Sequence, residues 1–193
     1  MLTRLKTYLI AALTLIAIGS VTGSCVVALS SGPAWSTGVR YGFKSDVALA
    51  EALWRALCGA RMAGPDRLNV HAFAGRKPHA IVQQIWAGNV MVQGRMARAV
   101  VKANHTSHGA TIQSVYDHPN KYLTSYTVMF QNIAGYDPQN RDWFWVKFGP
   151  DGQIDKDTNG VAIAGRVDSP SGFGCAACHR KLGGKDLETF TSK

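Results

Sequence analysis

Two cysteines and a histidine near the end of the chain have the spacing of a covalent cofactor site. Residues Cys175, Cys178 and His179 form the pattern C-x-x-C-H, which is typical of c-type haem attachment. Two thiols at this spacing can each add to one vinyl group of a porphyrin, and the adjacent histidine can then bind the iron as proximal ligand. The pattern therefore predicts one covalent haem c, tethered by the two cysteines, with His179 as the metal ligand.

Other uses of this pentapeptide fit the rest of the chain less well. A structural zinc site needs four nitrogen or sulfur ligands, usually supplied as two pairs. The only other cysteines, Cys25 and Cys58, do not form a second pair. A redox dithiol is expected beside a βαβ unit, whereas this pair follows a loop near the C-terminus. A disulfide or a redox dithiol stays an alternative, although neither would use His179.

The N-terminal segment has the composition of an export signal. Arg4 and Lys6 precede a strongly apolar stretch at residues 8–29 that contains no charge. This stretch is long enough to be a secretory signal or a membrane anchor. Because the basic residues stay on the inner side, the rest of the chain is expected in the periplasm, where haem c is also attached. The chain then has three parts: a signal peptide or anchor at residues 1–30, a linker at 31–44 and a haem domain at 45–193.

The charge balance bears on the partners of this domain. The formal net charge is +9 at pH 7, and without residues 1–30 it is carried by 19 basic against 12 acidic residues. A positive surface suits an acidic redox partner, such as another cytochrome, or a membrane surface. Simple solubility explains the same charge equally well. The basic residues do not gather with aromatic residues, so no nucleic-acid partner is expected. The sequence leaves a homodimer as a further option for this domain.

The patterning along the chain predicts an α+β fold, mainly an antiparallel sheet flanked by helices. A helix is expected from Ser45, as N-cap, to the Gly64-Pro65 pair. Pro78 and Gly88 bracket a second helix at Lys77–Trp86. A polar loop is expected at residues 104–122. Alternating residues predict strands at Leu68–Phe73, Met96–Ala103, Ser125–Gln131, Trp143–Phe148 and Val161–Val167.

The central and C-terminal parts of the chain resemble a known family. Gly135-Tyr-Asp-Pro138, then Asp142-Trp-Phe-Trp145, then the C-x-x-C-H pattern are similar to blocks of the cytochrome P-460 family, which includes cytochrome c′-beta. The resemblance extends from about Asp66 to Phe190. It implies a mostly antiparallel sheet packed against helices and one five-coordinate haem. Family members oxidise hydroxylamine toward nitrous oxide or nitric oxide, or bind nitric oxide without turnover.

The resemblance also singles out Lys102 as a candidate catalytic residue. Hydroxylamine-oxidising members carry a lysine bonded to a haem meso carbon, and the segment Val100–Asn104 is similar to the one that carries it. Ala103 stands where relatives commonly have an acidic residue. If haem covers this strand face, Lys102 would be desolvated, which favours the neutral amine that can form such a bond. A strand lysine that reaches solvent is the alternative.

Three functions follow as hypotheses. The first is hydroxylamine oxidation at a five-coordinate haem, for which the sequence shows no clear proton-accepting base. The second is nitric oxide binding beneath an apolar cap, with Phe130 or Phe144 as candidates. The third is an electron-transfer or accessory haem subunit, which requires a sixth ligand. His79 is expected on an exposed helix and plays no part. Candidate sixth ligands are Met91, Met96, Met129, His105 and His108.

Overall fold

A computed structural model describes residues 40–168, 174–183 and 187–188. The predicted signal or anchor at residues 1–30 and most of the linker lie outside the described residues. Among the helices of the described part, none combines the length and the apolar character needed to cross a bilayer.

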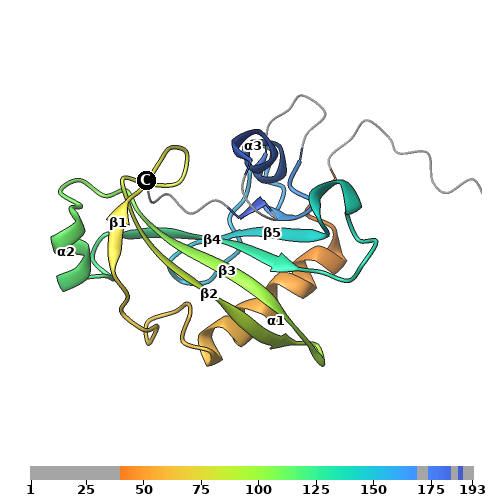
Figure 1. Ribbon diagram of the computed structural model, residues 1–193, viewed down its shortest axis with the longest axis horizontal. Coiled ribbons are helices and arrows are strands. Elements are labelled where there is room, and N and C mark those ends of the chain that lie inside the picture. The colour runs from red at the N-terminus through yellow and green to blue at the C-terminus, as the bar shows by residue number, and fades with distance from the viewer. Residues whose placement is uncertain (1–39, 169–173, 184–186, 189–193) are drawn as a thin grey trace, which may run out of the picture. The chain divides into compact units, whose positions relative to one another are not determined.

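The described chain forms a six-stranded antiparallel sheet in which the strands follow one another in sequence order (Figure 1). Each strand therefore pairs with its neighbours along the chain, as in a meander. The observed sheet and helices confirm the α+β class. The strands are β1 (Ala72–Ala74), β2 (Val82–Val92), β3 (Arg95–His105), β4 (Leu123–Gln131), β5 (Trp143–Phe148) and β6 (Ala164–Gly165).

Two of the helices lie on opposite faces of this sheet, as Figure 1 shows for α1 and α3. The first helix buries residues at a spacing of three to four, including Ala50, Leu53 and Leu57, so one stripe of it packs on the sheet. Its N-cap is Phe43, two residues before the predicted Ser45. The helical elements are α1 (Lys44–Gly59), α2 (Ile112–Asp117), η1 (Pro138–Asn140, a 3-10 turn) and α3 (Cys175–Leu182).

Alternation along the strands divides the interior into two unequal clusters. The larger cluster faces α1 and contains Val101, Phe130 and Phe144. The smaller cluster lies on the other face, where Val100, Met129 and Trp145 pack with Ala176 of α3. Successive strand residues point to opposite faces, so neighbours in sequence such as Phe144 and Trp145 belong to different clusters.

The predicted helix at Lys77–Trp86 is wrong. The second half of that segment, from Val82, belongs to β2, which pairs with β3 over eleven consecutive positions. The two strands are joined by the two-residue turn Gln93-Gly94, and both of its residues have positive φ values (49° and 79°). This is the geometry of a tight hairpin turn, for which glycine is favoured. Pairing along the whole hairpin outweighs the local helix signals of Pro78 and Gly88.

The remaining elements match the sequence to different degrees. The predicted strands at Met96–Ala103, Ser125–Gln131 and Trp143–Phe148 are confirmed, and the first two extend further than expected. The predicted strand at Leu68–Phe73 is displaced to β1, and the one at Val161–Val167 shortens to β6. The polar loop at residues 104–122 contains α2, whose N-cap Thr111 accepts a hydrogen bond from the Ser114 backbone at 3.0 Å.

Candidate haem site

The C-x-x-C-H residues form the first five positions of α3. Gly174 is the N-cap and adopts φ 124° and ψ 171°, a conformation almost restricted to glycine. A Cβ atom at this position would lie 2.7 Å from the carbonyl oxygen of Val167, so the preceding chain also demands glycine. Cys175 and Cys178 are free, partly buried thiols. Burial raises the pKa of Cys175 to about 12.

His179 is held in a defined orientation beneath α3. Its side chain is buried, with 3% of the residue exposed. The ring Nδ1 lies 2.7 Å from the carbonyl oxygen of Leu187, which fixes Nδ1 as the protonated nitrogen and leaves Nε2 as the one with a lone pair. The indole ring of Trp145 contacts the imidazole edge-on, with centroids 4.7 Å apart. Burial lowers the pKa of His179, which favours the neutral ring that a metal requires.

A small pocket lies between α3 and the sheet, with about 290 Å³ of empty space that is partly open to solvent. Most of its wall area is apolar, although the side chains of two histidines, a lysine and a threonine also line it. Cys178 is not among the lining residues. The wall is formed by His79, Val100, Lys102, Thr127, Val128, Met129, Trp145, Val146, Cys175 and His179.

Lys102 lies in the middle of the sheet and contributes to this pocket. It is paired between Ile85 of β2 and Thr127 of β4, and only 3% of it is exposed. Burial lowers its pKa from 10.5 to about 8, while Cys178 and Glu188 act in the opposite direction. The predicted desolvation of this lysine therefore occurs even without a cofactor on the strand. The alternative of a lysine that reaches solvent does not hold.

His79 is the functional candidate that the sequence misplaced. It lies in the connection between β1 and β2, not on a helix, and it lines the pocket. Its Nδ1 is 3.3 Å from the hydroxyl oxygen of Thr127. Burial, followed by the charges of Lys102 and His179, lowers its pKa to about 4. The false helix prediction for Lys77–Trp86 concealed this position, because it directed His79 toward solvent.

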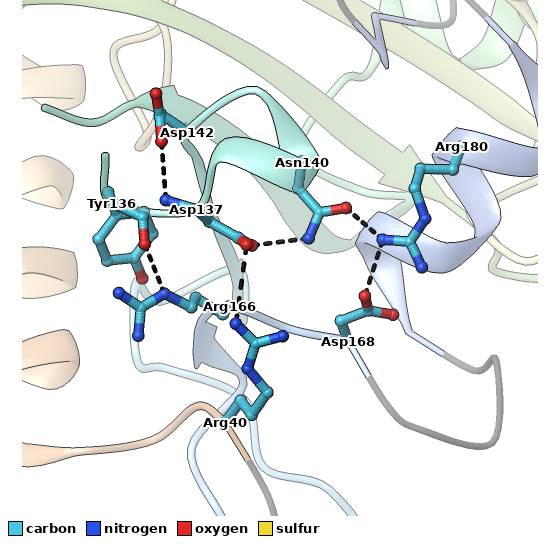
Figure 2. A network of polar contacts seen from close by, with 8 residues as sticks. All are labelled: Arg40, Tyr136, Asp137, Asn140, Asp142, Arg166, Asp168 and Arg180. Atoms are coloured by element: carbon cyan, nitrogen blue, oxygen red, sulfur yellow. Dashed lines mark hydrogen bonds and ion pairs between the residues drawn. The ribbon is translucent and has the colours of Figure 1, made fainter. Parts of the chain in front are cut away.

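Two sets of polar contacts attach α3 and the residues after it to the sheet. Arg98 of β3 forms a bidentate ion pair with Glu188. Glu188 directly follows Leu187, whose carbonyl accepts the hydrogen bond from the His179 ring. Arg180 of α3 bonds to Asn140 and to Asp168, the latter at 2.7 Å (Figure 2). Arg98 and Arg180 therefore hold this part of the chain in place.

The same network explains the two acidic residues near β5. Figure 2 shows that the Asp137 carboxylate accepts a hydrogen bond from the side-chain amide of Asn140 at 2.7 Å and forms an ion pair with Arg40 at 3.7 Å. The backbone N–H of Asp137 donates to the Asp142 carboxylate in the turn around η1. Neither carboxylate lines the pocket. They stabilise the turn against which Arg180 and α3 rest, as expected of turn residues.

Most of the proposed sixth ligands point away from the pocket. Met91 and Met96 are 53% and 56% exposed, and His108 is also exposed. His105 is fully buried and does not line the pocket, and burial with the charge of Arg67 lowers its pKa to about 4. Only Met129 of that group reaches the cavity.

The predicted apolar cap from Phe130 or Phe144 is wrong. Both rings belong to the cluster that faces α1, on the far side of the sheet from His179. In β4 and β5 it is instead the neighbouring residues Met129 and Trp145 whose side chains lie on the pocket side of the sheet. The physical reason is the alternation of strand side chains, which the sequence pattern alone could not orient.

The residues present fit a c-type haem. His179 Nδ1 donates to a backbone carbonyl, and Nε2 keeps a lone pair that could bind a metal. This is the usual arrangement of a metal-bound imidazole. One thiol lines the cavity next to it, and the second lies three positions along the same helix. Within the described ranges, no three His, Cys, Asp or Glu side chains converge as a metal-binding group of protein ligands alone.

Comparisons with family models, with curated proteins and with solved structures find no match.

Proposed function

We propose that this chain is a periplasmic mono-haem c-type cytochrome of nitrogen-oxide chemistry, and that it oxidises hydroxylamine at the haem iron. The observation that supports this most directly is the shared pocket of Cys175, His179 and Lys102. These residues come from a C-terminal helix and a central strand, yet they line one small cavity. The resemblance to the cytochrome P-460 family attaches hydroxylamine oxidation to this combination of a haem-binding helix and a strand lysine.

Each residue has a distinct part in this proposal. Cys175 and Cys178 tether the porphyrin by thioethers, and His179 binds the iron, which supplies the redox chemistry. The Leu187 carbonyl holds the imidazole in the tautomer that this ligation needs. Burial lowers the pKa of Lys102 to about 8, so its neutral amine is far more accessible near neutral pH than that of an exposed lysine, and it is the group available to bond to the edge of the ring. The apolar walls exclude water and admit a small nitrogenous substrate.

Nitric oxide binding without turnover is the second candidate. The observation that favours it is the mostly apolar wall area of the pocket, because a neutral diatomic needs no charged partner whereas substrate oxidation must release protons. No carboxylate lines the pocket among the described residues. In this variant of the proposal, Lys102 remains an unmodified buried amine.

The proposed location and partner rest on other parts of the chain. The apolar segment at residues 8–29 would direct export or hold the protein at the inner membrane. The excess of basic residues would favour an acidic electron acceptor, such as a second cytochrome, in the enzymatic case.

The test is to produce the chain in a host with cytochrome c maturation, then measure the absorption spectrum and the mass of the haem peptide. Two thioethers at Cys175 and Cys178 support the haem proposal. A third covalent link at Lys102, lost in Lys102→Arg, together with a red-shifted ferrous band, supports hydroxylamine oxidation. Two links only, with nitric oxide binding and no hydroxylamine turnover, support the gas-binding variant. Recovery of both thiols unmodified would refute the proposal.

A further inference from the structure

We propose that His79 is a second axial nitrogen ligand, which opposes His179 and closes the site until a small ligand displaces it. This inference rests on the proposed haem function and concerns the resting state of the same site. It assigns a role to a histidine outside the C-x-x-C-H pattern. It also predicts that the iron is six-coordinate at rest, unlike the open site that the family resemblance implies.

The first support is the spacing of the two rings. The centroids of His79 and His179 are 6.0 Å apart, and the ring planes are at 85°. Two imidazoles on opposite sides of one metal need a centroid separation of about 6 Å, because each metal–nitrogen bond is about 2.0–2.1 Å and each nitrogen lies about 1.1 Å from its ring centre. Nearly perpendicular planes are compatible with such a pair.

The second support is the hydrogen bonding of each ring. The Nδ1 atom of His79 is engaged by the Thr127 hydroxyl, and that of His179 by the Leu187 carbonyl. The Leu187 carbonyl can only accept, so it leaves Nε2 of His179 for a metal. The Thr127 hydroxyl can also accept from Nδ1 of His79, and in that tautomer Nε2 of His79 is likewise the nitrogen for a metal. A metal-bound histidine typically has its other ring nitrogen held by such a partner. The two histidines thus share one arrangement, although they come from unrelated parts of the chain.

The third support is the way the backbone holds His79. The connection between β1 and β2 is closed by a hydrogen bond from the Gly75 N–H to the Ile81 carbonyl at 2.7 Å. Within it, the His79 N–H bonds to the Arg76 carbonyl at 3.0 Å. In Figure 1 this connection rises on the same side of the sheet as α3. A short surface connection can move without disturbing the sheet, which suits a ligand that must leave.

Met129 is the competing ligand, because its thioether also lines the pocket. It lies within β4, paired with Val100 and Trp145 on either side, so the strand restrains it. Its backbone therefore cannot move away with the ligand, whereas the connection that carries His79 can move as a unit. A displaceable ligand is therefore expected from the connection rather than from the strand.

The experiment compares absorption and electron paramagnetic resonance spectra of the haem-loaded wild type, His79→Ala, Met129→Leu and the exposed control His108→Ala. We expect a low-spin spectrum in the wild type, Met129→Leu and His108→Ala, and a high-spin spectrum in His79→Ala. Added imidazole should return His79→Ala to low spin. Nitric oxide should bind His79→Ala at least ten times faster than the wild type.

Two results would overturn the inference while leaving the haem proposal intact. One is a high-spin wild type whose spectrum His79→Ala does not alter. The other is a low-spin spectrum that persists in His79→Ala, or that Met129→Leu abolishes. A wild type that carries no covalent haem would instead refute the proposed function, and with it this inference.

Discussion

Lys102 is the residue in which position and charge conflict most strongly. Its strand is central, its neighbours on both sides are paired, and no described acidic side chain lines its pocket. Removing an ammonium group from water is costly, and burial accordingly lowers the pKa of Lys102 to about 8. Folding therefore favours release of its proton, and the same preference supplies the neutral amine that the proposed chemistry would use.

This conflict predicts a pH-dependent stability of the haem-free chain. The unfolded chain keeps this proton up to about pH 10.5, whereas the folded chain releases it near pH 8. Between these values the unfolded state binds more protons, so stability rises with pH. Below pH 8 the burial cost is present in full. We expect Lys102→Met to be more stable than the wild type by up to about 3 kcal/mol at pH 7.

The measurement is urea denaturation of both proteins from pH 7 to pH 11. The difference between them should shrink as the pH rises from 8 to 10.5. Lys121→Met, at an exposed lysine, should show little difference from the wild type at any pH. A difference for Lys102→Met that does not vary with pH would contradict this explanation.

At the residue scale, the sequence predicted the members of the site better than their surroundings. The spacing of Cys175, Cys178 and His179 is a local pattern, so it can be recognised even where the prediction of the fold is wrong. The burial of Lys102 also follows from its place in a confirmed strand. His79 could not be found, because its role depends on the β1–β2 connection bringing it near α3. No short-range pattern records such a contact.

At the scale of elements, the start of α3 depends on one glycine. Gly174 combines a positive φ with a close approach to the Val167 carbonyl, whereas Gly183, just after α3, has a positive φ and open space around it. The two glycines therefore form a matched pair. They separate the cost of backbone conformation from the cost of a steric clash.

We expect Gly174→Ala to lower the free energy of unfolding by about 2 kcal/mol or more, because a Cβ there is both strained and blocked. Gly183→Ala should lower it by about 1 kcal/mol, from conformation alone. Urea denaturation of the two variants measures the difference. The yield of covalent haem should fall only in Gly174→Ala. Equal effects in both variants would show that the clash with Val167 is relieved by a small shift.

The β2–β3 hairpin shows why helix and strand were confused. Proline and glycine often mark the ends of helices, but neither Pro78 nor Gly88 is at a helix end here. The informative signal was the Gln93-Gly94 turn, which fixes the pairing of β2 with β3. The strand at Trp143–Phe148 was predicted correctly because its bulky apolar residues have a high preference for a buried sheet. Pairing partners, unlike local preference, are not encoded within one segment.

At the scale of the whole described domain, the sheet separates stability from chemistry. The larger cluster faces α1 and contains none of the C-x-x-C-H residues, whereas the smaller one borders the pocket. Neighbouring residues of β5 lie on opposite faces of the sheet. Phe144 is fully buried on the α1 side, and Trp145 touches His179 on the other.

Phe144→Leu should therefore lower the free energy of unfolding by about 1–2 kcal/mol and leave the haem spectrum unchanged. Trp145→Phe should shift the spectrum or the reduction potential, because the indole packs against the proposed iron ligand. Both variants can be followed by denaturation and by visible absorption. A spectral change in Phe144→Leu as large as that in Trp145→Phe would show that the two faces are not independent.

The consecutive order of the six strands has a consequence for how the chain acquires its shape. Every pairing joins segments that are adjacent along the backbone, so little loop entropy is lost before contacts form, and assembly is expected to be fast. Growth from the first hairpin onward would leave α3, which comes after all six strands, as the last piece to dock. Until then its two thiols would remain within reach of the enzymes that would attach the proposed haem.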